Sequence, residues 1–302
     1  MTTTSPSPVT APAPPTPAPA RTRRASLASP GSRGLRILCA VALTVIAIAF
    51  LLPFGWLVLA SFDAGATLNA KLPEVWTLSN FQKVATARTA GVPLLNSLLL
   101  SLGSAAITVA CAVLAAYPLS RFRMRMNDAF MYGILFGTCL PITAMMVPVY
   151  ALFVQLNLLD TRFGTIAFLA ATGLPMAIFM TKSFMDSVPI SLEEAAWVDG
   201  ATSMRTLWSV VLPLMRPGLA VVFVFNFVGV WGNFFVPFIL LLSPEKHPAA
   251  VSIFSFFGAY GAVAYGQLAA FSLLYSVPVL VLYVIVQKFL GGGFNLAGAV
   301  KG

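Results

Sequence analysis

The chain has 302 residues, of which 59% are hydrophobic and only 9% are charged. A typical globular domain carries about a quarter charged residues, so this composition excludes a water-soluble fold and predicts an integral membrane protein. The single histidine, His247, excludes a multi-histidine metal site. The three cysteines lie far apart in apolar runs, without the spacing of metal ligands or of a disulfide framework (Cys39, Cys111 and Cys139).

The N-terminal residues 1–34 are rich in Thr, Ser, Pro and Ala and end in a basic cluster, so we expect a disordered tail. The apolar run 37–62 that follows is longer than the core of a signal peptide. It is also long enough to cross a hydrocarbon core of about 30 Å, so we expect a retained first membrane span.

Charged residues separate the remaining apolar runs, which lie within 88–121, 128–160, 162–182, 216–245 and 247–288. In the last run, residues 248–266 are rich in small residues, whereas 268–290 contain the Leu, Val and Ile typical of a span. We therefore expect six spans in a domain of residues 35–290, a segment 248–266 on the outer surface, and a tail of residues 291–302. A seventh span through 248–266 is the alternative.

The distribution of Lys and Arg predicts the orientation of these spans. With both termini in the cytoplasm, 13 of the 18 basic residues fall on the cytoplasmic side and five fall outside. That asymmetry agrees with the positive-inside rule. It also accounts for much of the formal net charge of +9 without a nucleic-acid partner.

The connection between Lys182 and Arg216 is predicted to fold into two short helices on the cytoplasmic side. Ser191 and Glu194 have the spacing of a capping box, and Gly200 can end the first helix in the left-handed conformation. A second helix is expected from Thr202 or Ser203. Its apolar face would be formed by residues with helical spacing (Met204, Leu207, Trp208 and Val211). An interfacial hairpin that only anchors the loop is one interpretation; a docking element for a partner is the other.

Several motifs of this connection resemble the EAA loop of binding-protein-dependent ABC importers. They are Glu194-Ala195-Ala196, Asp199-Gly200-Ala201, Leu212-Pro213 and Pro217. Other segments are similar to MalG-type sugar permease subunits: Trp76 to Phe81, Asn96-Ser97, Ala116-Tyr117-Pro118, Arg121-Phe122, Leu159-Asp160-Thr161, Trp231 to Phe234, and Gly298 to Gly302. The resemblance covers the chain from about residue 37 to its end.

This resemblance implies an all-α integral membrane protein with six transmembrane helices, the type I ABC-importer permease fold and a coupling-helix loop at 187–217. It implies a bacterial cytoplasmic (inner) membrane protein that pairs with a second permease, a dimer of ATPase subunits and an extracytoplasmic sugar-binding protein. ATP and Mg would bind to the partner ATPase, and this chain would bind no cofactor. The residues expected to couple to the ATPase are Glu193, Glu194, Ala195, Ala196, Asp199, Gly200 and Ala201.

The expected spans contain essentially no ionisable residue, which fits a neutral substrate such as a sugar. Candidates for the substrate path are polar and aromatic residues of the last two spans: Asn226, Trp231, Asn233, Tyr275 and Ser276. The alternative for these residues is hydrogen bonding between helices and placement at the membrane interface.

Three other functions were weighed against a sugar importer. An ABC importer for another neutral or phosphorylated small solute is the nearest, and the MalG-like segments argue against it. A membrane enzyme would need a cluster of His, Asp or Glu, yet the acidic cluster is confined to Glu193, Glu194 and Asp199. A stand-alone secondary transporter would show intramembrane charges or inverted repeats.

Overall fold

The computed structural model describes residues 31–69, 71–122, 125–258 and 263–298, which are mostly helical. Helices and helical turns follow one another in the order α1 (Gly31–Ser61), α2 (Ser79–Val84), η1 (Ala87–Gly91), α3 (Val92–Arg121), α4 (Asn127–Gly137), α5 (Ile142–Gln155), α6 (Arg162–Asp186), α7 (Ile190–Val198), α8 (Ser203–Thr206), η2 (Leu207–Val211), α9 (Leu212–Leu214), α10 (Arg216–Trp231), α11 (Phe235–Leu240), η3 (Pro244–Lys246), α12 (Ala249–Ser252), η4 (Ile253–Phe256) and α13 (Tyr265–Gly298).

The chain divides into two compact units at Leu52 and Pro53, within helix α1. The described part of the first unit is the helical segment 31–52, whose side chains are exposed from residue 34 onward. This helix confirms a long apolar helix at 37–62. We expected a disordered tail at residues 1–34. Residues 1–30 lie outside the described residues, and residues 31–34 belong to α1.

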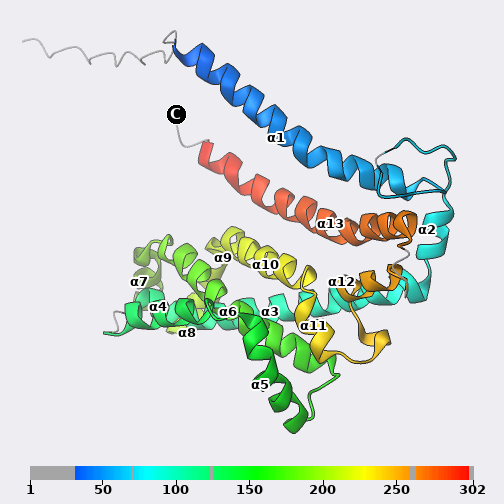
Figure 1. The fold of residues 1–302 in the computed structure, drawn as a ribbon. Helices are drawn as coiled ribbons and strands as arrows, with labels where there is room; N and C mark the ends of the chain where they lie inside the picture. Colours follow the sequence, from blue (N-terminus) through cyan, green and yellow to red (C-terminus); the bar gives the residue numbers. More distant parts are fainter. Residues whose placement is uncertain (1–30, 70, 123–124, 259–262, 299–302) are drawn as a thin grey trace, which may run out of the picture. The chain divides into compact units, whose positions relative to one another are not determined.

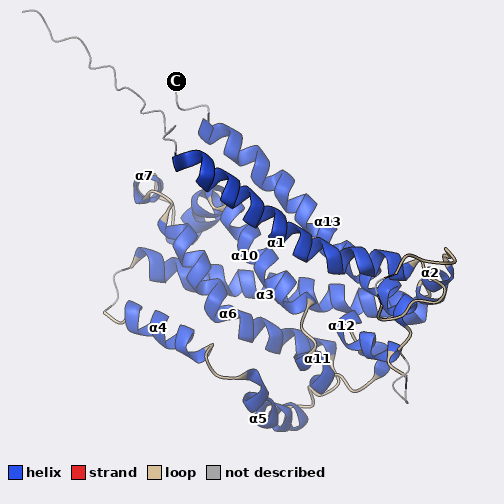
Figure 2. Ribbon diagram, turned by 45° about the horizontal axis from the view of Figure 1, so that its top comes forward, coloured by secondary structure: helices blue, strands red, loops and turns tan. Residues whose placement is uncertain are grey.

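Helices α3, α6 and α10 form the centre of the second unit (Figures 1 and 2). Small residues allow α3 to approach α6 closely: a Cβ at Gly103 would lie 3.1 Å from Ile166 Cδ1. Hydroxyls of α3 also bond to carbonyls of α6, with Ser104 Oγ 3.2 Å from Ile166 O and Thr108 Oγ1 3.2 Å from Ala170 O. Such close contacts between small and hydroxylated residues are typical of helix packing in membranes.

Among the described residues, four helices are long and apolar enough to cross a membrane. Two bent helix pairs raise this number to six if each pair is one span: 127–155 with a bend of 90°, and 203–231 with a bend of 81°. The second pair begins inside the expected cytoplasmic connection, so it does not coincide with the expected fifth span at 216–245. The fold is thus the all-helical one expected. The two ends of α3 carry different structures, with α12 near its N-terminus and α7 beyond its C-terminus (Figures 1 and 2). We call these the α12 end and the α7 end.

The break inside the third apolar run was not expected. Helix α4 ends at Gly137 and α5 begins at Ile142, after Pro141. Pro141 has the extended conformation of an N-cap, and proline disfavours the helical conformation of the residue before it, which favours a break at this position.

The fifth span also differs from the expectation of one long helix. Helix α10 has 16 residues, or about 24 Å at 1.5 Å per residue, which is shorter than the hydrocarbon core. After a break at residues 232–234 the chain continues as α11.

The segment 248–266 contains no helix of spanning length among its described residues, which agrees with the expected six spans. It consists of α12, η4 and the start of α13. Helix α13 begins at Tyr265 and continues to Gly298, past the expected end at residue 290.

Candidate functional site

The loop segment 187–217 forms a helix, a sharp turn and a second helix at the α7 end. Gly200 turns the chain with φ of +83°, the left-handed conformation that glycine adopts without steric cost. Its amide donates to Trp197 O, and the Ala201 amide donates to Ala196 O, which ends α7 as expected. The second helix begins where the sequence predicts, because Thr202 Oγ1 accepts a hydrogen bond from the Arg205 amide.

The predicted capping box at Ser191 and Glu194 is wrong. Helix α7 begins at Ile190 with Pro189 as its N-cap, and no side chain caps it. Since Pro189 already has the extended conformation that precedes a helix, Ser191 becomes part of the first turn and its hydroxyl no longer occupies the capping position.

Six of the seven residues expected to couple to a partner are accessible on α7 and the turn that follows it. Glu194, Ala195, Asp199 and Gly200 are exposed, and Ala196 and Ala201 are half-buried. The small side chains give this surface little relief, so another protein can approach the backbone of α7 closely. We call these six residues the docking surface.

Glu193 lies on the opposite side of α7, inside the chain. Its side chain is fully buried, and Oε1 forms an ion pair with Arg121 Nε of α3 at 2.5 Å. Oε2 accepts a hydrogen bond of 3.1 Å from the Tyr117 hydroxyl. Sequence reasoning placed Glu193 with the exposed residues and missed Arg121 as its partner; the available signal was an arginine that directly ends a long apolar run.

The expected apolar face of the second helix is divided. Leu207 and Val211 are buried, whereas Met204 and Trp208 are exposed. The buried face of this helix is therefore narrower than expected and consists of Leu207 and Val211, which lie at the two ends of a π-helical turn. Leu207 and Val211 pack with Val113 and Met185, so this helix anchors the loop segment to α3 and α6.

A groove between α6 and α10 contains two of the five candidate substrate-path residues. Its volume is about 530 Å³, and Asn226 and Asn233 line it together with Thr172 and Gly173. Asn226 Nδ2 donates to Val222 O at 2.8 Å, and Asn226 Oδ1 faces Gly173, where a Cβ would lie only 2.5 Å away. The remaining surface of the groove is mostly apolar.

The other three candidates stack on, or form hydrogen bonds with, other groups of the same chain. The Trp231 ring is 3% exposed and stacks on Tyr275 with centroids 5.3 Å apart. The Tyr275 hydroxyl donates to Trp231 O at 2.6 Å, and Ser276 Oγ donates to Ser272 O at 2.9 Å. In this chain these groups stabilise contacts within and between α10 and α13.

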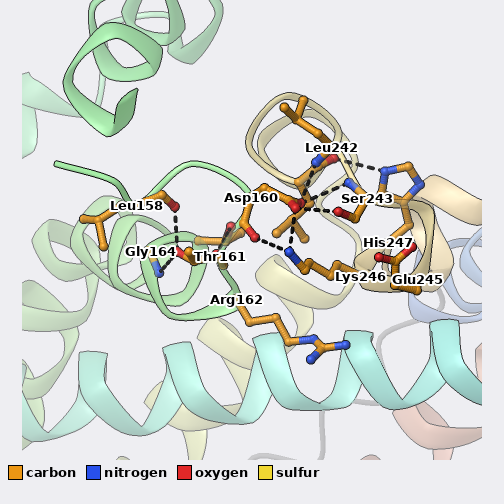
Figure 3. Close-up of polar contacts among 12 residues, drawn as sticks. Leu158, Asp160, Thr161, Arg162, Gly164, Leu242, Ser243, Glu245, Lys246 and His247 are labelled. Carbon is orange, nitrogen blue, oxygen red and sulfur yellow. Dashed lines mark hydrogen bonds and ion pairs between the residues drawn. The ribbon is translucent and has the colours of Figure 1, made fainter. Parts of the chain in front are cut away.

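At the α12 end, Asp160 holds the loop after α11 in place. Figure 3 shows Ser243 and Lys246 pointing toward its carboxylate. Oδ1 accepts from the amides of Leu242 and Ser243 at 2.9 and 3.0 Å, and Oδ2 pairs with Lys246 Nζ at 2.5 Å. Burial alone would raise the pKa of Asp160, but the hydrogen bonds from Lys246 and Ser243 outweigh it and hold this pKa well below its ordinary value.

Asn96 and Ser97 connect the same loop to α3. Asn96 Nδ2 donates to the carbonyls of Glu245 and His247 at 2.9 and 3.1 Å, and Asn96 Oδ1 accepts from Arg162 Nε at 3.1 Å. Ser97 Oγ accepts from the Ala249 amide. The motifs noted in the sequence at these positions are therefore contacts that hold the α12 end together.

The substitution Asp160→Asn is expected to lower the free energy of unfolding at pH 7 by about 1.5–3 kcal/mol, because hydrogen bonds to a charged group are lost. A lowered native pKa stabilises the protein above the ordinary pKa of about 4, and this contribution disappears as the pH falls through the native pKa. The variant should therefore lose less stability than the native chain between pH 5 and pH 3. Thermal unfolding in detergent measures both effects. Asp128→Asn, at an exposed carboxylate, is the control; an equal loss in both variants contradicts the assignment.

Residues 108–292 match a family described as binding-protein-dependent transport system inner membrane component. The chain is 30% identical over 276 residues to the inner membrane ABC transporter permease protein YcjP of Escherichia coli, covering 87% of this chain and 95% of that protein. It is 29% identical over 279 residues to the diacetylchitobiose uptake system permease protein NgcG of Streptomyces coelicolor, covering 90% and 91%.

A solved bacterial ABC transporter involved in the import of the acidic polysaccharide alginate has a chain of the same fold. The TM-score is 0.75 at 25% identity, covering 86% of this chain and 98% of that chain. The family match runs from the middle of α3 to the last part of α13 and includes the whole loop segment. The chain therefore belongs to the family of binding-protein-dependent transport system inner membrane components and is a multi-pass permease.

Proposed function

We propose that this chain is one permease subunit of an ATP-driven sugar importer and forms half of its translocation pore. The observation that carries the proposal is the loop segment, which exposes the small docking surface of α7 while Leu207 and Val211 anchor its second helix. When a partner bound to this surface moves, the anchored loop segment can transmit that movement to α3 and α6. The relatives named for diacetylchitobiose uptake and alginate import support a carbohydrate as the substrate.

The proposed assembly contains a second, homologous permease, two ATPase subunits with their ATP and Mg, and an extracytoplasmic sugar-binding protein. The loop segment and both termini lie on the cytoplasmic side, where the ATPase subunits bind. The positive-inside distribution of Lys and Arg supports this orientation.

The test is ATP hydrolysis by the complete importer in proteoliposomes, with neutral and acidic oligosaccharides supplied together with the binding protein. Stimulation by an oligosaccharide is the expected result. Stimulation by an amino acid or a phosphate ester alone would favour an importer for another small solute. A chain that transports sugar without any ATPase subunit would overturn the proposal.

Asn226 and Asn233 are proposed to contact the substrate, because they are the two amide side chains that line an otherwise apolar groove. Asn226 is 6% exposed and donates to Val222 O, and Asn233 Oδ1 accepts from the Val236 amide, so a sugar hydroxyl would bond to the remaining hydrogen-bonding positions of these amides. The substitution Asn226→Leu is expected to reduce sugar transport roughly 2- to 10-fold, the effect of one lost hydrogen bond. Uptake of labelled sugar at equal amounts of assembled importer is the measurement. Ser276→Ala removes a hydroxyl already bonded within α13 and should have no effect. Equal transport by both variants would remove Asn226 from the path.

A further inference from the structure

Arg121 joins three helices at the α7 end. It is the last residue of α3, and its side chain is 5% exposed. While Nε pairs with Glu193 of α7, Nη2 donates to Met185 O at 3.0 Å and to Val188 O at 3.2 Å. Met185 is in the last turn of α6, and Val188 lies in the short connection between α6 and α7. One guanidinium therefore fixes α3, the end of α6 and α7 relative to one another.

Both carboxylate oxygens of Glu193 accept hydrogen bonds from α3. Arg121 binds Oε1, and the hydroxyl of Tyr117, one turn earlier on α3, binds Oε2. Two partners from one helix define the direction of the carboxylate as well as its position. The Tyr117 ring packs in an apolar cluster with Val188 and Leu207, and the Glu193 side chain is fully buried, which limits the access of water to these contacts.

Helix α7 has little else to hold its orientation. Of its nine residues, all described, Glu193 is the one that is buried. Leu192 and Val198 are exposed, and Ala196 and Trp197 are half-buried, so apolar packing orients the helix only in part. A buried ion pair adds little net stability compared with apolar residues, but it can specify one geometry among several.

We propose that Tyr117, Arg121 and Glu193 form an internal clamp that sets the angle of α7 to α3 and α6. They are positioning residues for coupling, and this inference rests on the proposed function of the loop segment. Glu193 acts from inside the chain by directing the docking surface, which meets the partner. Without the clamp, α7 still binds its partner, but its movement is no longer passed fully to α3.

The experiment measures the number of sugar molecules transported per ATP hydrolysed by the complete importer in proteoliposomes. The triple variant Tyr117→Phe, Arg121→Met, Glu193→Leu replaces the clamp with apolar side chains of similar size, so the chain should still fold. We expect normal assembly and ATP hydrolysis with a roughly 5-fold or greater fall in sugar per ATP, the size of a typical coupling effect. A purely structural role would lower the amount of importer and leave this ratio unchanged.

Two controls separate the possible failures. Lys182→Gln removes an exposed ion pair with Asp186 at the same end and should not change the ratio. Glu194→Lys alters the docking surface itself. If Glu194→Lys changes the ratio and the triple variant does not, the clamp is overturned and the proposed function stands. If neither variant changes the ratio, both the clamp and the proposed coupling function of the loop segment are overturned.

The single variant Tyr117→Phe keeps the inference testable if the triple variant does not assemble. It removes one hydroxyl from Glu193 and leaves the ring in the core. A smaller fall in sugar per ATP is expected. An unchanged ratio in this fully assembled variant would also overturn the clamp.

Discussion

The substitution Gly200→Pro is expected to abolish the stimulation of ATP hydrolysis by sugar in the complete importer. Gly200 has φ of +83°, whereas proline is fixed near −65°. Proline also removes the amide that donates to Trp197 O at 3.0 Å. The turn between α7 and α8 must therefore change, and the docking surface points in another direction. We expect at least an order of magnitude less stimulated hydrolysis, within the range of known coupling energies.

The matched control is Gly200→Asn, because asparagine tolerates the left-handed conformation. It should retain most of the stimulation. Equal loss in both variants would show that position 200 needs the absence of a side chain rather than a positive φ. Full stimulation of Gly200→Pro would contradict the coupling function of the loop segment.

The substitution Gly218→Ala is expected to destabilise the bundle, because the added methyl group has no room. A Cβ at this position would lie 2.5 Å from Cγ and 2.9 Å from Cβ of Phe184. Both atoms are close to the backbone of α6, so a change of side-chain rotamer cannot easily relieve the clash. Overpacking of this kind costs about 1–3 kcal/mol. The thermal unfolding midpoint of the purified chain in detergent should fall by several degrees.

Gly229→Ala is the control on the same helix, because no atom lies within 4 Å of the added Cβ. Alanine favours the helix more than glycine does by up to about 1 kcal/mol, so this variant should be as stable as the native chain or more stable. Similar unfolding midpoints for the two variants would mean that α10 can move away from Phe184 without cost.

The sequence predicts the helical fold because its apolar runs are long and its charges mark their ends. It also predicts the turn at Gly200, since a glycine after a short helix is a strong signal. The predicted cap at Ser191 is wrong, because α7 begins one residue earlier, at Ile190 after Pro189. The capping-box spacing alone does not show whether the helix begins at that residue or just before it.

The roles of Glu193 and Glu194 could not be separated from the sequence. They are adjacent and chemically alike, yet one is buried and the other exposed. The difference arises from Arg121, which lies 72 residues away along the chain. The π-helical turn at 207–211 is also invisible in the apolar pattern, because its extra residue changes the side-chain register only once the backbone has formed.

Helix α3 carries Asn96 and Ser97 near one end and Arg121 at the other, about 38 Å apart at 1.5 Å per residue. Its first turns hold the loop at the α12 end, and its last residue holds α7. A shift of α3 that is favoured by a ligand on one side must change the affinity for a ligand on the other side. Thermodynamic linkage makes this effect reciprocal. In the proposed importer, the factor by which an ATPase subunit alters the affinity for the sugar-binding protein would therefore equal the factor in the opposite direction.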